Sequence, residues 1–453
     1  MGTELKCFKN ETKKDRPEMF QNERKMKIMK IIESTKIKEK AYFEKLENGL
    51  NIIIIPKANT NKKYVMWGTN FGSIDNRFIM PQTNEEVFIP DGVAHFLEHK
   101  MFEQKNGRNS LDVLMALGLD ANAYTTNDHT AYLFECSSDK FYEGLDELMD
   151  YVQNPYFTDE NVEKEKGIIG QEIKMYDDDP GFQLYLNAMD CLYHKNAVKL
   201  DIAGTIESIS KIDPDVLYKC YNTFYHPSNM TLVVCGDFVP EDLLEEIKSR
   251  LIPKDNQGEI KRIYEHEEES INMSSKEVNM EVSSPIFMVA IKDKVPSSEE
   301  AVKRHIAVSI ILNLLIGKSS NLYKKLYNDG DLLSEPDMDY EFSKQYAHIL
   351  VGGQSKNPEK IHEKFKKEIE KFRENGLNKE DFERIKRKLY GDYVTEYNNV
   401  GYIARMFLSD SFKGINSFDY IEKFDNVTKE YTEQLFNEIF NEDKMAISII
   451  RPK

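Results

Sequence analysis

Two distant stretches of this chain repeat one order of structural elements, and this repeat limits the possible folds more than any other feature. Residues 132–173 contain an apolar strand pattern, a polar turn, an amphipathic helical pattern and a second helix that opens with TDENVEKEK. Residues 349–393 contain the same series, with NKEDFERIK at the start of the last helix. We interpret the repeat as an internal duplication of an α+β unit of roughly 200 residues. A chance match between helical patterns is the alternative.

The duplication predicts two homologous domains on either side of a polar linker. Residues 1–252 are the expected N-terminal domain. Its first part, residues 1–46, is dense in Lys and Glu and predicts an exposed helical lead-in. Residues 253–276 contain the polar runs EHEEES and NMSS and are the linker candidate. Residues 277–453 are then the C-terminal domain.

Local patterns predict several elements of the N-terminal domain. The apolar runs LNIIIIP (50–56) and YVMWGTNFGSID (64–75) flank the polar turn ANTNKK and predict a β-hairpin. A long helix is expected over residues 159–176, where Thr158 and Asp159 supply a capping signal.

Composition restricts the partners that the chain can have. The formal net charge of −17 opposes attraction to nucleic acid or to an anionic membrane, and we expect neither partner. The longest apolar runs, such as Ile52–Ile55 and Ile306–Ile316, are far too short to cross a bilayer. The five cysteines form no CxxC pair and the first residues contain no apolar secretory segment. We therefore expect a cytoplasmic protein with reduced thiols.

The stretch DGVAHFLEHKMF (91–102) predicts a metal site. A helix is expected here, with Asp91 as its cap, and it would place His95 and His99 one turn apart on the same face. Two neutral imidazoles at this spacing can reach one Zn²⁺ at about 2.0–2.1 Å. Glu98 can stand beside the metal and take a proton from a water that Zn²⁺ has acidified. A solvated helix surface is the simpler alternative.

A catalytic zinc normally has three protein ligands, so a third must come from another element. The run ENVEKEKGIIGQEIKMYDDDP contains Glu165 and Glu172, which are seven residues apart and share one helical face. The neighbouring Ile168, Ile169 and Ile173 indicate that this helix is partly buried. A half-buried carboxylate is costly unless it is paired or bound to metal. Ordinary surface glutamates are the alternative.

At these residues the chain resembles the M16 metallopeptidases, the inverzincin family that includes pitrilysin, insulin-degrading enzyme and the mitochondrial processing peptidase. HFLEHKMF is similar to the HxxEH segment of the family, and Glu165–x6–Glu172 is similar to its downstream acidic pair. The resemblance implies that His95, His99 and Glu172 bind Zn²⁺. It also implies that Glu98 is the catalytic base and that Glu165 orients the site.

The segment DANAYTTNDHTAY (120–132) resembles the family strand onto which substrate is added as an extra strand. It would place Asn122, Ala123 and Tyr124 against the peptide backbone. The resemblance and the duplication together imply an α+β fold of two homologous domains. Each domain would be a largely antiparallel sheet with helices packed on one face, and the two would form one half of a clamshell. The implied activity is that of a zinc endopeptidase acting on short or unfolded peptides.

The second half departs from the family pattern. The residues aligned with the acidic pair are Ile385 and Asp392, and no HxxEH precedes them, so one zinc per chain is expected. Members of the family carry an Arg and a Tyr in this half that hold the substrate carbonyl and the oxyanion. Here Tyr327 occupies the Arg position and Ser334 the Tyr position.

Two explanations fit this departure. A homologous partner chain that lacks zinc ligands can supply the Arg and Tyr, or Tyr327, Tyr340 or a nearby lysine can substitute. We favour the partner, because the chain is most similar to bacterial members that are encoded beside a zinc-less companion. A non-catalytic M16-like scaffold or assembly subunit is the main alternative function, and a non-peptidase zinc hydrolase is a weaker one.

Overall fold

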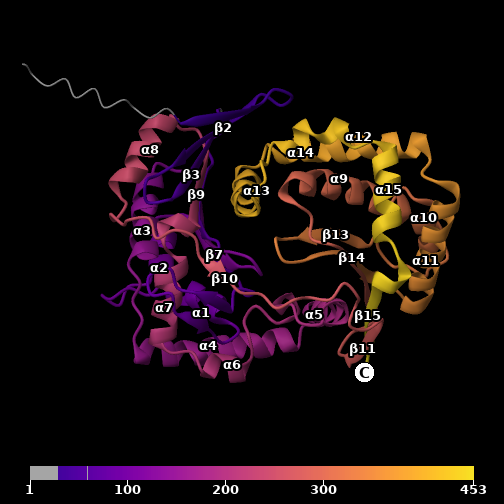
Figure 1. Cartoon of the computed structure of the whole chain (residues 1–453), viewed down its shortest axis with the longest axis horizontal. Coiled ribbons are helices and arrows are strands. Elements are labelled where there is room, and N and C mark those ends of the chain that lie inside the picture. Colours follow the sequence, from indigo (N-terminus) through magenta and orange to yellow (C-terminus); the bar gives the residue numbers. More distant parts are fainter. Residues whose placement is uncertain (1–28, 59) are drawn as a thin grey trace, which may run out of the picture.

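The computed structural model describes residues 29–58 and 60–453, and within them the strands form two large sheets (Figure 1). The N-terminal half of the molecule (β1 to α8) contains a sheet in the order β1-β2-β3-β9-β4-β8-β7. Every neighbouring pair in it is antiparallel except β3 and β9. Its strands are β1 (Lys30–Ser34), β2 (Glu39–Lys45), β3 (Asn51–Pro56), β4 (Lys63–Thr69), β7 (Asp120–Thr125), β8 (Thr130–Cys136) and β9 (Met230–Gly236).

Helices of the same half cover one face of this sheet, and a small sheet in the order β10-β5-β6 lies at its side. The helices of this half are α1 (Val93–Lys100), α2 (Ser110–Ala116), α3 (Phe141–Gln153), α4 (Asp159–Asp177), α5 (Pro180–Leu192), α6 (Ile206–Ser210), α7 (Pro214–Phe224) and α8 (Pro240–Ser249), and α5 is not among those that cover this sheet. The short strands are β5 (Arg77–Ile79), β6 (Glu86–Phe88) and β10 (Lys261–Arg262), and the 3₁₀ turns are η1 (Ala197–Lys199) and η2 (Pro227–Asn229).

The C-terminal half (β11 to β15) contains a sheet in the order β11-β15-β12-β14-β13, in which only β11 and β15 are parallel. Its strands are β11 (Ser275–Met280), β12 (Ile286–Lys292), β13 (Asp337–Phe342), β14 (Ala347–Gln354) and β15 (Met445–Pro452). Its helices and 3₁₀ turns are α9 (Ser298–Leu315), α10 (Asn321–Asn328), α11 (Pro358–Asn375), α12 (Lys379–Glu396), α13 (Val400–Lys413), α14 (Asp419–Glu422), η3 (Phe424–Asn426), α15 (Lys429–Ile439) and η4 (Glu442–Lys444).

The strand orders confirm the duplication. Five strands of each half correspond in chain order: β3, β4, β7, β8 and β9 in the N-terminal half, and β11, β12, β13, β14 and β15 in the C-terminal half. The two sets have the same spatial order in their sheets. In both, the last strand inserts between the first two and pairs in parallel with the first. The predicted α+β fold of two homologous, largely antiparallel units with helices on one face is therefore confirmed.

Each half also places one helix on the sheet of the other half, which the sequence did not predict. Helix α13 lies against β4 and β9 of the N-terminal sheet, and α5 lies against β12 and β15 of the C-terminal sheet (Figure 1). Phe407 and Leu408 of α13 are buried there, as are Met189 and Leu192 of α5. The exchanged helices give each sheet a second covered face and bind the two halves together.

Close packing fixes α13 on its sheet. A Cβ atom at Gly68 of β4 would lie 2.8 Å from the Leu408 side chain. A Cβ atom at Gly401 of α13 would lie 3.0 Å from the ring of Tyr64. Glycine at these two positions lets the helix approach the strand, because any larger residue would push the two apart.

Three local predictions were wrong. Residues 30–45 do not form a helical lead-in; they form β1 and β2, which pair through Ile32 and Ala41, and Ala41 is buried beneath α13. This tertiary packing outweighs the helix-forming composition. The rest of that prediction, residues 1–28, lies outside the described residues. Strands β3 and β4 form no hairpin, because β9 lies between them. Asp91 does not cap α1, whose N-cap is Gly92.

The predicted linker is tied to both halves. Glu267 accepts hydrogen bonds from the backbone N–H groups of residues 194–196 at 2.8–2.9 Å. Its Oε1 also lies 2.6 Å from Nζ of Lys292 on β12. The linker contributes β10 to the small sheet, and its last residues begin β11. Because α5 and α13 are exchanged, neither predicted domain, 1–252 or 277–453, contains all the side chains that cover its own sheet.

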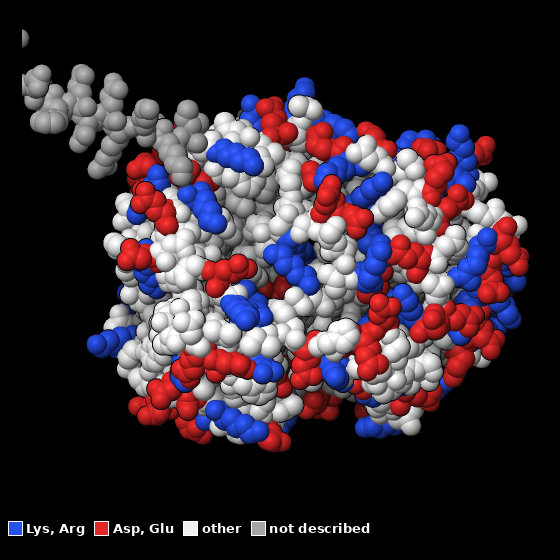
Figure 2. Space-filling view, viewed as in Figure 1, with Lys and Arg blue, Asp and Glu red and all other residues white. Residues whose placement is uncertain are grey.

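The surface carries charges of both signs. On the face shown in Figure 2, acidic and basic side chains are interspersed over both halves. Among the described helices, none combines the length and the apolar content that crossing a membrane requires.

Candidate metal centre

Helices α1 and α4 bring His95, His99 and Glu172 together. One nitrogen from each imidazole and one oxygen of the carboxylate all lie within 4.8 Å of one another. We call these three residues the metal cluster. Because Glu172 is far from the histidines in sequence, only the packing of α4 against α1 creates the cluster.

Local sequence places both helices. Helix α1 begins after Gly92, which has a φ of 95° and lies so close to the chain that a Cβ would be 2.5 Å from the Ala203 carbonyl oxygen. Only glycine suits that turn. Helix α4 begins with the predicted Thr158 cap, completed by a reciprocal hydrogen bond with Asn161. Ile169 of α4 is fully buried in the core, which fixes the rotation of the helix.

Two distances within the cluster are close to the ligand separations of a tetrahedral zinc ion. Nε2 of His95 lies 3.6 Å from Oε1 of Glu172, and Nε2 of His99 lies 3.5 Å from Oε2. Both separations are longer than an ordinary hydrogen bond of about 2.9–3.0 Å. Ligands about 2.0–2.1 Å from a tetrahedral ion are separated by about 3.3–3.4 Å. Each histidine therefore lies close to this separation from a different oxygen of Glu172.

Glu165 orients His99. Its Oε1 lies 3.0 Å from Nδ1 of His99, so Nδ1–H can donate to it and leave the Nε2 lone pair directed toward the cluster. Burial opposes the charged imidazolium of His99, but the bond to Glu165 and the nearby carboxylates outweigh it, and the pKa of His99 is raised. Burial lowers the pKa of His95 to about 3, which keeps that ring neutral, the form that binds metals.

Lys100 is a site residue that the sequence did not reveal. Its side chain is 0% exposed, and Nζ lies 2.6 Å from Oε2 of Glu103 and 3.3 Å from Oε2 of Glu165. Burial raises the pKa of Glu165, but the bonds to His99 and Lys100 outweigh that effect and lower it. Lys100 thus keeps Glu165 ionised beside His99. The only sequence signal was its place directly after the motif.

Glu98 is held beside the cluster by the edge of the sheet. Thr125, the last residue of β7, donates a hydrogen bond of 2.6 Å to Oε2 of Glu98. The Glu98 carboxylate is buried, and burial raises its pKa despite the hydrogen bond from Thr125. A carboxylate with a raised pKa accepts protons more readily near neutral pH.

The predicted substrate strand is β7, and it lies at the edge of the N-terminal sheet, paired only with β8 among the described strands. Its residues alternate between the two faces. Ala123 packs on the face that α1 covers, whereas Tyr124 packs on the face that α13 covers. Asn122 is exposed. The outer edge of β7 leaves backbone groups that an extended peptide could pair with.

The structure also places the residues of the second half that the sequence analysis aligned with the acidic pair, and the two tyrosines that it named as possible substitutes for the Arg and Tyr. Ile385 is buried in the core of the C-terminal half, and Asp392 is exposed and paired with Lys388 at 2.9 Å. Tyr327 is 53% exposed on α10. Tyr340 is buried, and its hydroxyl donates to Asp293 at 2.8 Å. Tyr340 is therefore committed to a structural contact within the C-terminal half.

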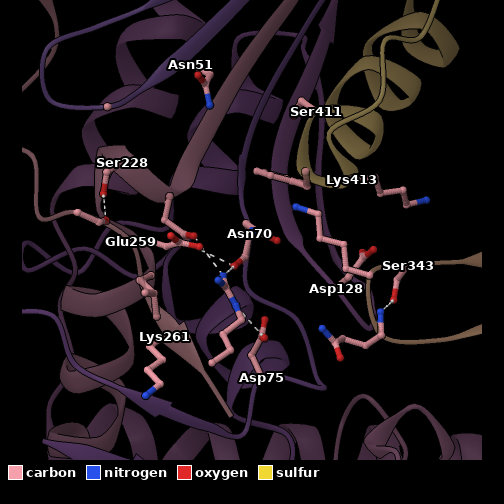
Figure 3. Close-up of a pocket in the computed structure, with 18 of the residues that line it drawn as sticks. Asn51, Asn70, Asp75, Asp128, Ser228, Glu259, Lys261, Ser343, Ser411 and Lys413 are labelled. Atoms are coloured by element: carbon pink, nitrogen blue, oxygen red, sulfur yellow. Dashed lines mark hydrogen bonds and ion pairs between the residues drawn. The ribbon is translucent and has the colours of Figure 1, made fainter. Parts of the chain in front are cut away.

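A large cavity lies elsewhere, at the junction of the two halves. It has a volume of about 1030 Å³ and none of the metal-cluster residues lines it. Figure 3 shows Asp75, Lys261 and Glu259 on one side, and Ser343 and Lys413 from the C-terminal half on the other. On one wall Arg262 pairs with Asp75 at 3.0 Å and donates to Asn229 at 3.1 Å.

Comparison with protein families agrees with this geometry. The family model described as Insulinase (Peptidase family M16) matches residues 88–206, which contain the whole metal cluster. The model described as Peptidase M16 inactive domain matches residues 211–389. The chain is 37% identical over 430 residues to the uncharacterised zinc protease YmfH of Bacillus subtilis, covering 94% of this chain and 100% of YmfH. It is 21% identical over 419 residues to the uncharacterised zinc protease YmxG of the same organism, covering 90% of this chain and 97% of YmxG.

Solved structures show the same fold. An M16-like peptidase from Alicyclobacillus acidocaldarius has a TM-score of 0.87 and 32% identity, covering 92% of this chain and 99% of that one. The periplasmic protease PqqL of Escherichia coli has a TM-score of 0.73 and 16% identity, covering 91% of this chain and 48% of that one. With a duplicated fold, two family models in consecutive parts and identity to YmfH along nearly its whole length, the chain belongs to the M16 peptidase family.

Proposed function

We propose that the chain is a zinc-dependent peptidase that hydrolyses short or unfolded peptides. The observation that carries this proposal is the convergence of His95, His99 and Glu172, which bring one possible ligand atom each to within 4.8 Å of one another. Relatives of the chain are named zinc proteases, which agrees with this donor set. Two histidines and a carboxylate, with room for a further ligand, are typical of catalytic zinc.

Each residue of the site has a definite task in this proposal. His95, His99 and Glu172 would hold Zn²⁺, which supplies Lewis acidity toward a peptide carbonyl and lowers the pKa of a water. Glu98 takes a proton from the attacking water and later gives it to the leaving amine. The hydrogen bond from Thr125 fixes the position of the Glu98 carboxylate. Glu165 keeps the His99 ring in the tautomer that presents Nε2.

The free edge of β7 supports an extended peptide as the substrate. A peptide that pairs with β7 would follow Asn122, Ala123 and Tyr124 and pass Thr125, whose hydroxyl holds Glu98. Folded domains usually protect their own edge strands with charges, bulges or a covering element, so they seldom offer a strand that could pair with this edge. This arrangement favours unfolded or short peptides over folded proteins.

We further propose that a homologous chain without zinc ligands completes the site with an Arg and a Tyr. Tyr327 stands where the family has the Arg, and Tyr340 is committed to Asp293. The PqqL chain supports pairing of two such units, since this chain covers only 48% of it. Loss of an oxyanion donor typically lowers the rate about 10²–10³-fold, so the lone chain should be a weak enzyme.

The cytoplasm remains our proposed location. Cys136, Cys191, Cys220 and Cys235 are buried free thiols, as is usual in reducing compartments.

Quenched-fluorescence peptides test this function. Turnover would be measured with the lone chain and with the chain plus a zinc-less homologue, each with and without a chelator. We expect turnover that requires zinc and rises at least about 10²-fold with the homologue. Equal turnover with and without the homologue would exclude the partner. No turnover in any mixture, from chain that does contain zinc, would favour the scaffold alternative.

A further inference from the structure

An arginine from the C-terminal half lies over the predicted substrate strand. Arg405 is on α13, the helix that the C-terminal half places on the N-terminal sheet. Its guanidinium carbon is 5.4 Å from the ring centre of Tyr124 on β7 and 5.6 Å from that of Tyr64 on β4. Both distances are within the range of cation–π contacts. The guanidinium therefore lies over two aromatic rings beside the edge of the sheet.

This guanidinium has no acidic partner. Among the described residues, no carboxylate lies within 4.0 Å of Arg405, although the chain has 78 acidic residues and many of its other cations are paired. The Arg405 side chain is exposed. The guanidinium also approaches the hydroxyls of Tyr64 and Tyr124. An arginine has five N–H donors in a fork geometry that matches a carboxylate, so further donors remain for a ligand. An incoming carboxylate could bind without breaking an existing ion pair.

The face of the sheet decides which substrate residues could reach Arg405. Tyr124 faces α13, whereas the next residue, Thr125, faces α1 and bonds to Glu98. A peptide added to the edge of β7 also alternates its side chains between the two faces. Every second side chain would therefore point toward Asn122, Tyr124 and Arg405, and the others toward the side of the metal cluster.

The matching position of the C-terminal half shows that the fold does not require an arginine here. Arg405 is the sixth residue of α13, and the sixth residue of the exchanged helix α5 is Tyr185. The matching edge strand, β13, carries the carboxylates of Asp337, Asp339 and Glu341. The β13 strand also has a cation over one of its rings, since Nζ of Lys413 lies 4.7 Å from the ring centre of Phe342. The two edge strands differ in their acidic residues, because β7 has only Asp120 whereas β13 has three.

We propose that Arg405, with Tyr124 and Asn122, forms a subsite that binds Asp or Glu side chains of the peptide substrate. The inference rests on the proposed peptidase function, because it assumes that peptides pair with β7. The proposed substrates are peptides that carry an acidic residue at a particular place. When such a peptide pairs with β7, the acidic side chain lies on the face turned away from the metal cluster.

Peptide binding tests the subsite without relying on turnover. The zinc-loaded Glu98→Gln chain would be titrated with labelled peptides of about ten residues in which one Glu replaces Gln at each position in turn. We expect Glu to bind about 2- to 5-fold more tightly than Gln at alternate positions, the size of an exposed charge pair. A further Arg405→Gln substitution should abolish the preference, and Arg405→Lys should retain part of it.

Arg387→Gln is the matched control, since Arg387 is exposed on α12 and the substitution changes the charge equally. It should leave the Glu preference intact. A preference that survives Arg405→Gln, a Glu-to-Gln ratio near one at every position, or no binding of any peptide would overturn the subsite. Turnover by the unsubstituted chain without a Glu preference would contradict the subsite alone. A Glu preference in zinc-loaded chain that lacks turnover would support the subsite and contradict the peptidase.

Discussion

The two halves of the molecule share one topology but use the space between the first helix and the edge strand differently. In the N-terminal half, α1 faces β7 through the contact between Glu98 and Thr125, and Glu172 of α4 completes the metal cluster. In the C-terminal half, α9 faces β13 with His305, which is enclosed by the rings of Tyr340, Phe342 and Tyr420. One half presents polar donors at this place, and the other is filled with aromatic side chains.

This contrast shows that the shared fold supplies a scaffold, whereas the side chains decide whether a half holds a metal site. On α12, the helix that corresponds to α4, Asp392 pairs with Lys388 at the surface while the neighbouring Tyr393 stacks on Tyr420. Aromatic packing stabilises the C-terminal half, since buried ring pairs add about 0.5–1.5 kcal/mol each beyond their buried area. The polar pocket of the N-terminal half forgoes that stabilisation and gains the donors that chemistry requires.

The largest loss of activity is expected on substitution of Glu98, the proposed proton acceptor in the N-terminal half. Glu98→Gln should lower peptide turnover by about 10²–10⁴-fold, because the amide cannot accept the proton. Zinc content should stay at one ion per chain, as measured by atomic emission on the purified protein. Turnover within a few-fold of the unsubstituted chain would remove Glu98 as the base.

A matched pair of substitutions contrasts the two halves at corresponding positions. Glu172→Gln should weaken zinc binding by more than about 100-fold, since it removes a ligand, a loss larger than that of an outer partner. Asp392→Asn should leave zinc binding unchanged, because that carboxylate pairs with Lys388 at the surface. Competition with a chromophoric chelator measures both affinities. Equal affinities for the two variants would contradict the assignment of the metal to the N-terminal half.

A smaller effect is expected at Lys100. Lys100→Met removes the buried cation beside Glu165 and should lower zinc affinity by about 10–100-fold. Lys164→Met is the control, because Lys164 is 68% exposed and lies 3.7 Å from Glu103. An exposed ion pair such as Lys164–Glu103 contributes little to the free energy of folding, so the control variant should bind zinc with normal affinity. Normal zinc affinity in both variants would show that Lys100 serves packing alone.

The last comparison concerns the exchanged helices and the pH dependence of stability. Each of these helices has an aspartate at its eleventh position, Asp190 on α5 and Asp410 on α13. On α5, Asp190 lies 2.9 Å from Nζ of Lys276; burial opposes its charge, but the bond to this lysine outweighs burial and lowers its pKa. On α13, Asp410 is buried with one oxygen unpartnered, and burial raises its pKa to about 6.

The signs of the two effects are opposite. For Asp410, stability is highest below its unfolded pKa and falls as pH rises through about 6, so Asp410→Asn should add about 1–3 kcal/mol at pH 8 and little at pH 4. For Asp190, stability is present above its unfolded pKa and falls as pH drops through the lowered folded value. Asp190→Asn should cost less than about 1 kcal/mol at pH 8. Urea titrations at both pH values measure this, and a destabilising Asp410→Asn at pH 8 would contradict it.

Much of the fold followed from local pattern, but the tertiary exchanges did not. The repeat over residues 132–173 and 349–393 predicted two homologous units because helical and strand periodicities survive in each. The amphipathic patterns of α5 and α13 do not predict which sheet each helix covers, because an apolar helix face can be buried against either sheet. The insertion of β9 between β3 and β4 likewise depends on pairing over a long sequence separation.

The site was predicted where spacing within one helix carries the information. His95 and His99 share a helical face, and the seven-residue spacing of Glu165 and Glu172 does the same on α4. Lys100 and Arg405 could not be predicted in this way. Lys100 is buried only because α4 brings Glu165 to it, and Arg405 reaches β7 only because α13 crosses to the other half.

Anomalous diffraction at the zinc edge, from crystals of the chain grown with zinc, tests the central claim most directly. The account predicts one strong peak in the N-terminal half, with Nε2 of His95, Nε2 of His99 and an oxygen of Glu172 at about 2.0–2.2 Å. A peak that lacks Glu172 or either histidine as a ligand, or bound zinc found only elsewhere, would contradict it.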